Sequence, residues 1–96
     1  LDPYSGKAFS NRGLTYRSLG QFERAIEDYD EAIRLNPQDV IAYNNRGNAY
    51  NLLGQGNRAI EDFTAAILIA PEFAMSFYNR GISYIILGQS EPAIQD

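Results

Sequence analysis

Residues 43–55 read YNNRGNAYNLLGQ, and two close versions of this segment occur in the 96-residue chain: FSNRGLTYRSLGQ at 9–21 and FYNRGISYIILGQ at 77–89. The three segments are spaced by 34 residues, and Pro3, Pro37 and Pro71 keep the same spacing. An Ala-Ile pair follows each segment, at 25–26, 59–60 and 93–94. A recurrence at one constant spacing over most of the chain indicates a structural repeat.

Each repeat predicts two amphipathic helices. Phe9, Gly13, Tyr16 and Leu19 are separated by four, three and three residues, which places them on one stripe of a helix that is expected to face the core. The stretch that starts at 25 shows a second stripe of the same kind after a turn at Gly-Gln 20–21. Each repeat is therefore predicted to be an antiparallel helical hairpin.

The ends of the helices are marked by capping residues and prolines. Ser5 and Asp39 stand where N-caps are expected. Each proline is expected to end the helix before it, because its ring and missing N–H cannot continue the hydrogen-bond ladder. The chain is divided into repeats at approximately 6–39, 40–73 and 74–96, of which the third is incomplete.

The repeat resembles the tetratricopeptide repeat, whose pattern is aromatic-x₂-Leu-Gly-x₂-Tyr, then Ala-x₃-Phe, then Pro. The first two repeats carry the pattern at Phe9, Gly13, Tyr16, Ala25, Tyr29, Ala32 and Pro37, and at Tyr43, Gly47, Tyr50, Ala59, Phe63, Ala66 and Pro71; the third carries it at Phe77, Gly81, Tyr84 and Ala93. Two departures stand out: Arg replaces Leu at 12, 46 and 80, and the aromatic Phe22 becomes Gly56 and Ser90. The resemblance implies one all-α domain over 1–96, a right-handed superhelical solenoid that binds proteins or peptides on its concave surface.

The composition argues against several other classes of protein. With 12 acidic and 8 basic residues the net charge is −4, which disfavours nucleic-acid binding. The absence of Cys and His excludes a disulfide framework, a zinc site and the commonest general base, so we expect no metal, no cofactor and no catalysis. The longest apolar run, at 65–70, is too short to span a bilayer, so no membrane insertion is expected.

The repeated glycines and arginines are interpreted as structural. A Gly inside a helix costs ~1 kcal/mol relative to Ala, so we expect the glycines at 13, 47 and 81 to allow close helix packing. The arginines are expected to lay their stems on the core and to pair with carboxylates of the packed helices. The expected pairs are Arg12 with Asp28, Arg46 with Asp62 and Arg80 with Asp96.

The concave stripe is predicted from positions on the first helix of each hairpin that lie away from the core stripe. It comprises Lys7, Ser10, Asn11, Leu14 and Arg17 in the first repeat, Ile41, Asn44, Asn45, Asn48 and Asn51 in the second, and Met75, Tyr78, Asn79, Ile82 and Ile85 in the third. Its chemistry changes from basic through amide-rich to apolar along the chain. The resemblance implies that the Asn two residues before each Gly, at 11, 45 and 79, binds the backbone of an extended ligand; the alternative is that these amides satisfy neighbouring helix or loop groups.

One subgroup of the family captures the C-terminal carboxylate of chaperones with Lys and Asn in the first unit, Asn in the second, and Lys and Arg in the third. Of these residues only Asn45 is matched, because Ser10, Leu14, Met75 and Asn79 stand at the other places. We therefore expect no recognition of a terminal carboxylate.

The leading interpretation is a non-catalytic scaffold that binds a protein or peptide, extended or helical, in its concave groove. Two alternatives remain open: a structural module that self-associates, or a repeat segment of a larger multidomain protein. For the first alternative, residues 91–96 are too few for a stable second helix, so we expect Phe77, Tyr84 and Leu87 to be partly uncovered and to drive formation of a homo-oligomer.

Overall fold

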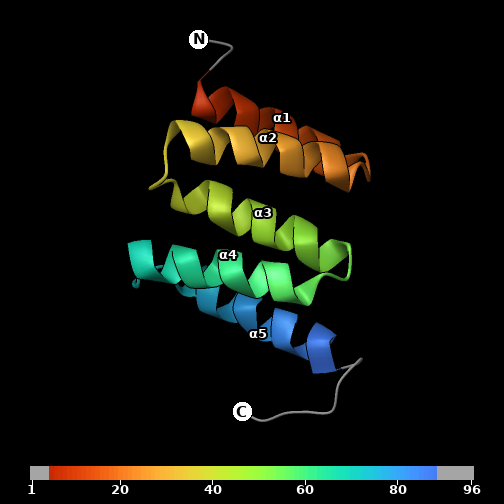
Figure 1. Cartoon of the computed structure of the whole chain (residues 1–96), viewed down its shortest axis with the longest axis vertical. Helices are drawn as coiled ribbons and strands as arrows, with labels where there is room; N and C mark the ends of the chain where they lie inside the picture. The colour runs from red at the N-terminus through yellow and green to blue at the C-terminus, as the bar shows by residue number, and fades with distance from the viewer. Residues whose placement is uncertain (1–4, 89–96) are drawn as a thin grey trace.

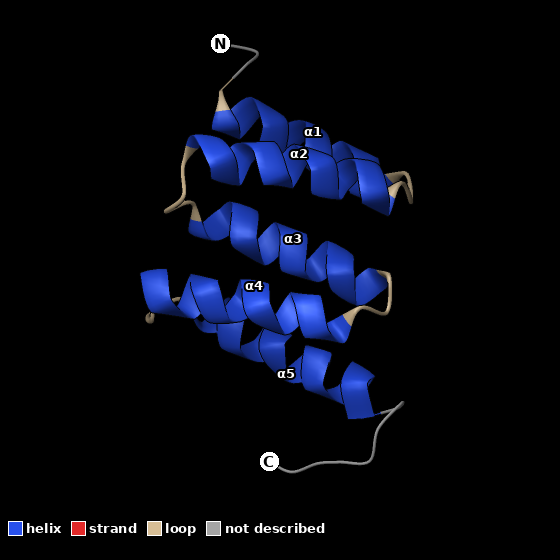
Figure 2. Ribbon diagram, viewed as in Figure 1, coloured by secondary structure: helices blue, strands red, loops and turns tan. Residues whose placement is uncertain are grey.

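The computed structural model describes residues 5–88, which form five α-helices and no strand (Figures 1 and 2). The helices are α1 Gly6–Ser18, α2 Phe22–Leu35, α3 Val40–Leu52, α4 Gly56–Ile69 and α5 Ala74–Gly88. The all-α class and the helical hairpins, α1 with α2 and α3 with α4, are confirmed. The expected roles of Pro3 and Asp96 concern positions outside the described residues.

The helix ends follow the predicted signals. The side chains of Ser5 and Asp39 accept hydrogen bonds of 3.1 Å from the backbone N–H groups of Ala8 and Ala42, as N-caps do. The helices α2 and α4 end at Leu35 and Ile69, two residues before Pro37 and Pro71. The sequence therefore predicted these four boundaries correctly.

The turn inside each hairpin depends on a glycine in the left-handed region. Gly20 has a φ of 79° and Gly54 a φ of 76°. Behind each glycine the chain folds back, so that the N–H of Gln21 donates to the carbonyl of Tyr16, and Gln55 repeats this bond to Tyr50. This closure of the helix end is typical of the Schellman motif. A residue with a Cβ at the position of the glycine would strain the turn.

In each of the two complete hairpins, an aromatic ring of the second helix packs over a glycine of the first helix. A Cβ on Gly13 would lie 2.6 Å from the ring of Tyr29, and a Cβ on Gly47 would lie 2.7 Å from the ring of Phe63. Both rings are fully buried. The packing role predicted for these two glycines is confirmed. Around a Cβ on Gly81 no described atom lies within 4 Å, and the equivalent ring position, 97, lies beyond the 96 residues.

One residue of the predicted core stripe was placed wrongly. Leu19 is 64% exposed, because α1 ends at Ser18 and Leu19 is its C-cap, where the chain already turns away from the stripe. The other members, Phe9, Gly13 and Tyr16, are buried or half-buried as expected.

The hairpins stack so that the first helices, α1, α3 and α5, lie on the inside of a curve. The first helices contact one another in sequence, α1 with α3 and α3 with α5, whereas the described helices α2 and α4 make no contact with each other. In Figure 1, α2 and α4 lie in front of α1 and α5, which forms two layers. In a curved stack, the helices of the inner layer lie closer together than those of the outer layer. The first helices are the ones that touch, so they form the concave surface.

Candidate functional site

The predicted concave stripe divides into two sets of residues in the structure. One set lies between consecutive first helices. The Oγ of Ser76 on α5 donates to the Oδ1 of Asn44 on α3 at 3.0 Å, and Ser83 donates in the same way to Asn51 at 2.8 Å. The two serines are fully buried, and Asn44 is nearly so. Asn44 and Asn51 thus hold α5 against α3 with their carbonyl oxygens.

We call the contact between two consecutive first helices a seam. The residues of the stripe that face a seam, here called the stacking positions, follow from these hydrogen bonds and from the 34-residue repeat. They are Ser10 and Arg17 on α1, Asn44 and Asn51 on α3, and Tyr78 and Ile85 on α5. Their partners on the next first helix are Ala42 and Ala49 in the first seam and Ser76 and Ser83 in the second. The two serines were not among the residues predicted from the sequence. The sequence holds one signal for them. At these two places of the repeat, the second unit has Ala and the third unit has Ser.

The groove positions are the rest of the stripe: Lys7, Asn11 and Leu14 on α1, Ile41, Asn45 and Asn48 on α3, and Met75, Asn79 and Ile82 on α5. These residues differ widely in exposure. Lys7, Asn11, Ile41 and Met75 are exposed, whereas Asn79 is buried. The three first helices lie side by side, α1 next to α3 and α3 next to α5.

Three amide groups of α3 and α5 have unused hydrogen-bond donors. The Nδ2 atoms of Asn44, Asn45 and Asn79 are buried and have no partner among the described residues. A buried donor without an acceptor costs about 1–3 kcal/mol, so native structures rarely leave one unpaired. These three amides therefore have hydrogen-bond donors that the described part of the chain does not use.

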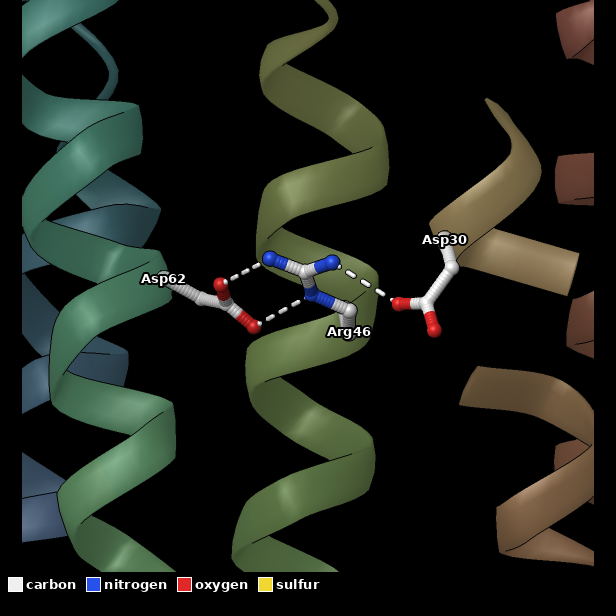
Figure 3. Close-up of polar contacts among 3 residues, drawn as sticks. All are labelled: Asp30, Arg46 and Asp62. Carbon is white, nitrogen blue, oxygen red and sulfur yellow. Dashed lines mark hydrogen bonds and ion pairs between the residues drawn. The ribbon is translucent and has the colours of Figure 1, made fainter. Parts of the chain in front are cut away.

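The arginines next to the glycines are engaged with carboxylates, as predicted for the first two repeats. Arg12 makes two hydrogen bonds to Asp28, at 2.9 and 2.8 Å, and Arg46 makes two to Asp62, at 2.9 and 2.7 Å. The guanidinium group of Arg46 also reaches Asp30 of the previous hairpin at 2.8 Å, as Figure 3 shows. Arg46 therefore joins α3 to both α4 and α2, and it is not free to bind a ligand.

Arg80 also contacts the preceding hairpin, but its partner there is a hydroxyl group. Its guanidinium group donates to the Oγ1 of Thr64 at 3.2 Å, and Thr64 is the repeat equivalent of Asp30. Its expected partner within the third repeat, Asp96, lies outside the described residues. The contacts to Asp30 and Thr64, which link neighbouring hairpins, were not foreseen because one residue type is not kept at this position.

Burial and the ion pair act in opposite directions on the carboxyl group of Asp62. Burial raises its pKa, and the hydrogen bonds and positive charge of Arg46 work against that increase. The net direction is upward. On the partner side, the hydrogen bonds that Arg46 donates to Asp62 contribute most to raising the pKa of Arg46. This guanidinium group therefore stays charged at every physiological pH.

Exposed apolar side chains gather on α5. Tyr78 is 69% exposed and Ile85 is 64% exposed, and Met75, Phe77, Ile82 and Tyr84 are also exposed. Two faces of the helix contribute. Phe77 and Tyr84 are equivalent to Phe9 and Tyr16, and Tyr16 packs on the core cluster that contains Ala25 and Tyr29 of α2, while Tyr78 and Ile85 occupy stacking positions. Both faces of α5 are thus those that further helices cover elsewhere in the repeat.

Metal binding and membrane crossing have no support within the described part of the chain. Residues 5–88 contain no group of three or more acidic side chains arranged to hold a metal ion. None of the five helices in this range combines the length and the apolar character that crossing a bilayer requires.

The fold and the stripe define a class of protein, an array of stacked helical hairpins. Two family models match the chain: a TPR repeat model over residues 13–54 and a tetratricopeptide repeat model over residues 40–73. The chain belongs to the tetratricopeptide repeat family. A search among curated proteins found no significant match.

Several solved structures superpose closely on this chain. The MamA protein has a TM-score of 0.86 at 30% identity, over 92% of this chain and 48% of that chain. The second TPR domain of human RPAP3, in complex with the HSP70 peptide SGPTIEEVD, has a TM-score of 0.83 at 30% identity, over 88% and 70%. The second TPR of Spaghetti (RPAP3), bound to the HSP90 peptide SRMEEVD, has a TM-score of 0.84 at 29% identity, over 88% and 79%. The chain thus spans about half the length of the MamA structure.

Proposed function

We propose that this chain is a non-catalytic binding module that holds an extended protein segment in the groove along α1, α3 and α5. The observation that carries the proposal is the set of buried Nδ2 donors of Asn45 and Asn79 that lack an acceptor. An extended backbone presents carbonyl groups at regular intervals, and an amide can both donate to it and accept from it. The peptide complexes of the RPAP3 domains support a peptide as the kind of ligand.

The experiment compares two asparagines. The probe is a fluorescein-labelled library of nonapeptides, acetylated at one end and amidated at the other, and the readout is fluorescence polarisation of the peptides that the chain retains. We expect Asn45→Ala to weaken binding by about tenfold, the effect of losing one or two buried hydrogen bonds. Asn57→Ala is the matched control, because Asn57 is exposed on α4. Urea unfolding of both variants shows whether the fold is kept.

Equal binding by Asn45→Ala and the parent chain, with both folded, would contradict the use of this amide. Loss of binding in the Asn57→Ala control would place the ligand on the outer surface and contradict the groove.

A second function, self-association, is favoured by the exposed apolar faces of α5. Burying a side chain such as Tyr84 or Ile85 contributes about 1.5–3 kcal/mol, so two such faces could drive chains together. Sedimentation velocity over a concentration series tests this. Tyr84→Ser should shift the chain toward monomer, whereas Leu68→Ser on α4, 79% exposed, should not. A chain that is monomeric at every concentration would exclude this second function. In either role, we propose that the chain acts as a segment of a longer protein.

A further inference from the structure

We infer that the groove is polarised: it binds an extended segment whose acidic side chain contacts Arg17 on α1 and whose apolar side chain, about six residues away, contacts Ile82 and Ile85 on α5. The inference rests on the proposed function and specifies the chemistry of its ligand. It is argued from three features of the described residues, namely the unpaired charge of Arg17, the amides of α3 and the uncovered isoleucines of α5.

Arg17 differs from every other arginine among residues 5–88. Three of the others pair with carboxylates, Arg80 donates to Thr64, and Arg24 and Arg58 lie over the rings of Tyr16 and Tyr50 at 5.7 Å. Within that range Arg17 makes no ion pair, no side-chain hydrogen bond and no ring contact. It is half-buried, and its charge acts against the increase that burial causes in the pKa of Tyr29.

The repeat explains why Arg17 has no partner. Arg17 is equivalent to Asn51, and Ala49 is equivalent to Ser83. In the second seam, Ser83 donates to Asn51. In the first seam, the corresponding partner has only a methyl group, which neither donates nor accepts. The five N–H donors of this guanidinium group are therefore available at the edge of the groove, and a carboxylate matches their geometry.

On α5, at the other side of the groove from Arg17, the residues are apolar. Ile82 is 37% exposed and Ile85 is 64% exposed, and both lie in the C-terminal half of α5, as Arg17 does in α1. Between them, α3 presents Asn48 at a groove position, next to Asn51, whose carbonyl oxygen accepts from Ser83. A ligand that crosses the three helices at this level thus meets a cation, then amides, then an apolar surface.

The spacing of the two contacts follows from helix packing. Axes of neighbouring packed helices are about 8–10 Å apart, so α1 and α5 are separated by roughly 20 Å across α3. An extended chain advances about 3.3 Å per residue, which makes this span about six residues. The contact at Arg17 is made by a side chain, so the segment needs no free C-terminus.

The experiment uses three pools of nonapeptides, all labelled with fluorescein, acetylated and amidated. The first pool has Glu at position 2 and Leu at position 8, the second has Leu at 2 and Glu at 8, and the third has Glu at 2 and Leu at 3. The other positions are randomised. We expect at least one of the first two pools to bind the chain about fivefold more tightly than the third, which has the same composition and the wrong spacing.

Variants of the chain locate the two contacts. Arg17→Gln should weaken the better pool about two- to fivefold, as expected for a solvent-accessible ion pair, and should remove the effect of replacing Glu by Gln in that pool. Ile82→Ala should remove the effect of replacing Leu by Ser. Arg24→Gln is the matched control, because Arg24 lies over the Tyr16 ring on the other side of α1 and should leave binding unchanged. Circular dichroism verifies that each variant is folded.

Equal binding of all three pools, or an Arg17→Gln variant that still distinguishes Glu from Gln, would overturn the polarised groove. If binding in that case still depended on Asn45, the proposed function would stand without this specificity. If no pool bound at all, both proposals would be wrong.

Discussion

Arg46 links the first two hairpins. It stands where the family has Leu, and its side chain joins the buried Asp62 of its own hairpin to Asp30 of the previous one (Figure 3). Its side chain is only 21% exposed and that of Asp62 only 5%, so water screens this pair poorly. Removing one partner of such a pair leaves an uncompensated charge in the interior.

Replacing Arg46 alone should therefore be costly, and replacing both partners should not. We expect Arg46→Leu to lower the free energy of unfolding by about 3 kcal/mol, because Asp62 stays buried without its cation. The double variant Arg46→Leu/Asp62→Leu should lose less than the sum of the single variants by about 2 kcal/mol. Urea denaturation of the four chains measures this coupling, and additivity within 0.5 kcal/mol, about the usual scatter, would contradict the buried pair.

Two glycines at equivalent positions should respond in opposite directions to the same substitution. Gly47→Ala places a Cβ 2.7 Å from the buried ring of Phe63 and should destabilise the chain by about 1–3 kcal/mol. Gly81→Ala meets no described atom within 4 Å, and the higher helix propensity of Ala should stabilise the chain by up to about 1 kcal/mol. Thermal unfolding compares the two. A stabilising Gly47→Ala would show that the ring does not occupy this position.

At the scale of the elements, the two seams between first helices differ in chemistry. The seam between α3 and α5 contains two serine-to-asparagine hydrogen bonds, whereas the equivalent places on α3 in the other seam carry Ala42 and Ala49. The start of α4 also approaches α5 closely, because a Cβ on Gly56 would lie 2.9 Å from the carbonyl oxygen of Ser83. This approach explains why Gly56 replaces the aromatic residue that the family usually has there.

Removing one seam hydrogen bond should loosen α5 selectively. Ser83→Ala leaves the Oδ1 of Asn51 without its donor and should cost about 1 kcal/mol. Amide hydrogen exchange should then become faster in α5 than in α1. Thr15→Ala is the matched control, because Thr15 is the exposed equivalent on α1 and bonds only to the carbonyl of Asn11 in its own helix. A uniform increase of exchange across all helices would contradict the local role of the seam.

The helices could be predicted from the sequence because every signal for them is local and repeated. Capping residues, turn glycines and prolines recur at 34 residues, and the Arg12 and Arg46 pairs could be predicted from the same spacing. The seam could not be predicted in this way. Ser76 and Ser83 matter only through residues 32 positions earlier, a separation that no helical period reveals. The same is true of Asp30 and Thr64, whose side chains contact the next hairpin.

Over the whole molecule, the curvature of the stack divides the predicted stripe into two sets of residues. The first helices touch, so part of the predicted stripe, such as Asn44, is used for stacking, and the rest, such as Asn45, lines the groove. The sequence predicted one surface, because angular position on a helix does not distinguish a neighbour from a ligand. Exposed apolar residues on α5 mark the end of the described stack and form the surface that we propose for self-association.

We propose above all that a peptide binds on the first-helix side of the stack. The most direct measurement is a set of ¹H–¹⁵N spectra of the labelled chain during titration with the nonapeptide pool that binds best. The account predicts chemical-shift changes at the side-chain amides of Asn45 and Asn48 and along the groove positions of α1 and α5. The outer residues of α2 and α4, including Asn57, should keep their shifts. Changes confined to the outer helices, with the side-chain signal of Asn45 unmoved at saturation, would contradict it.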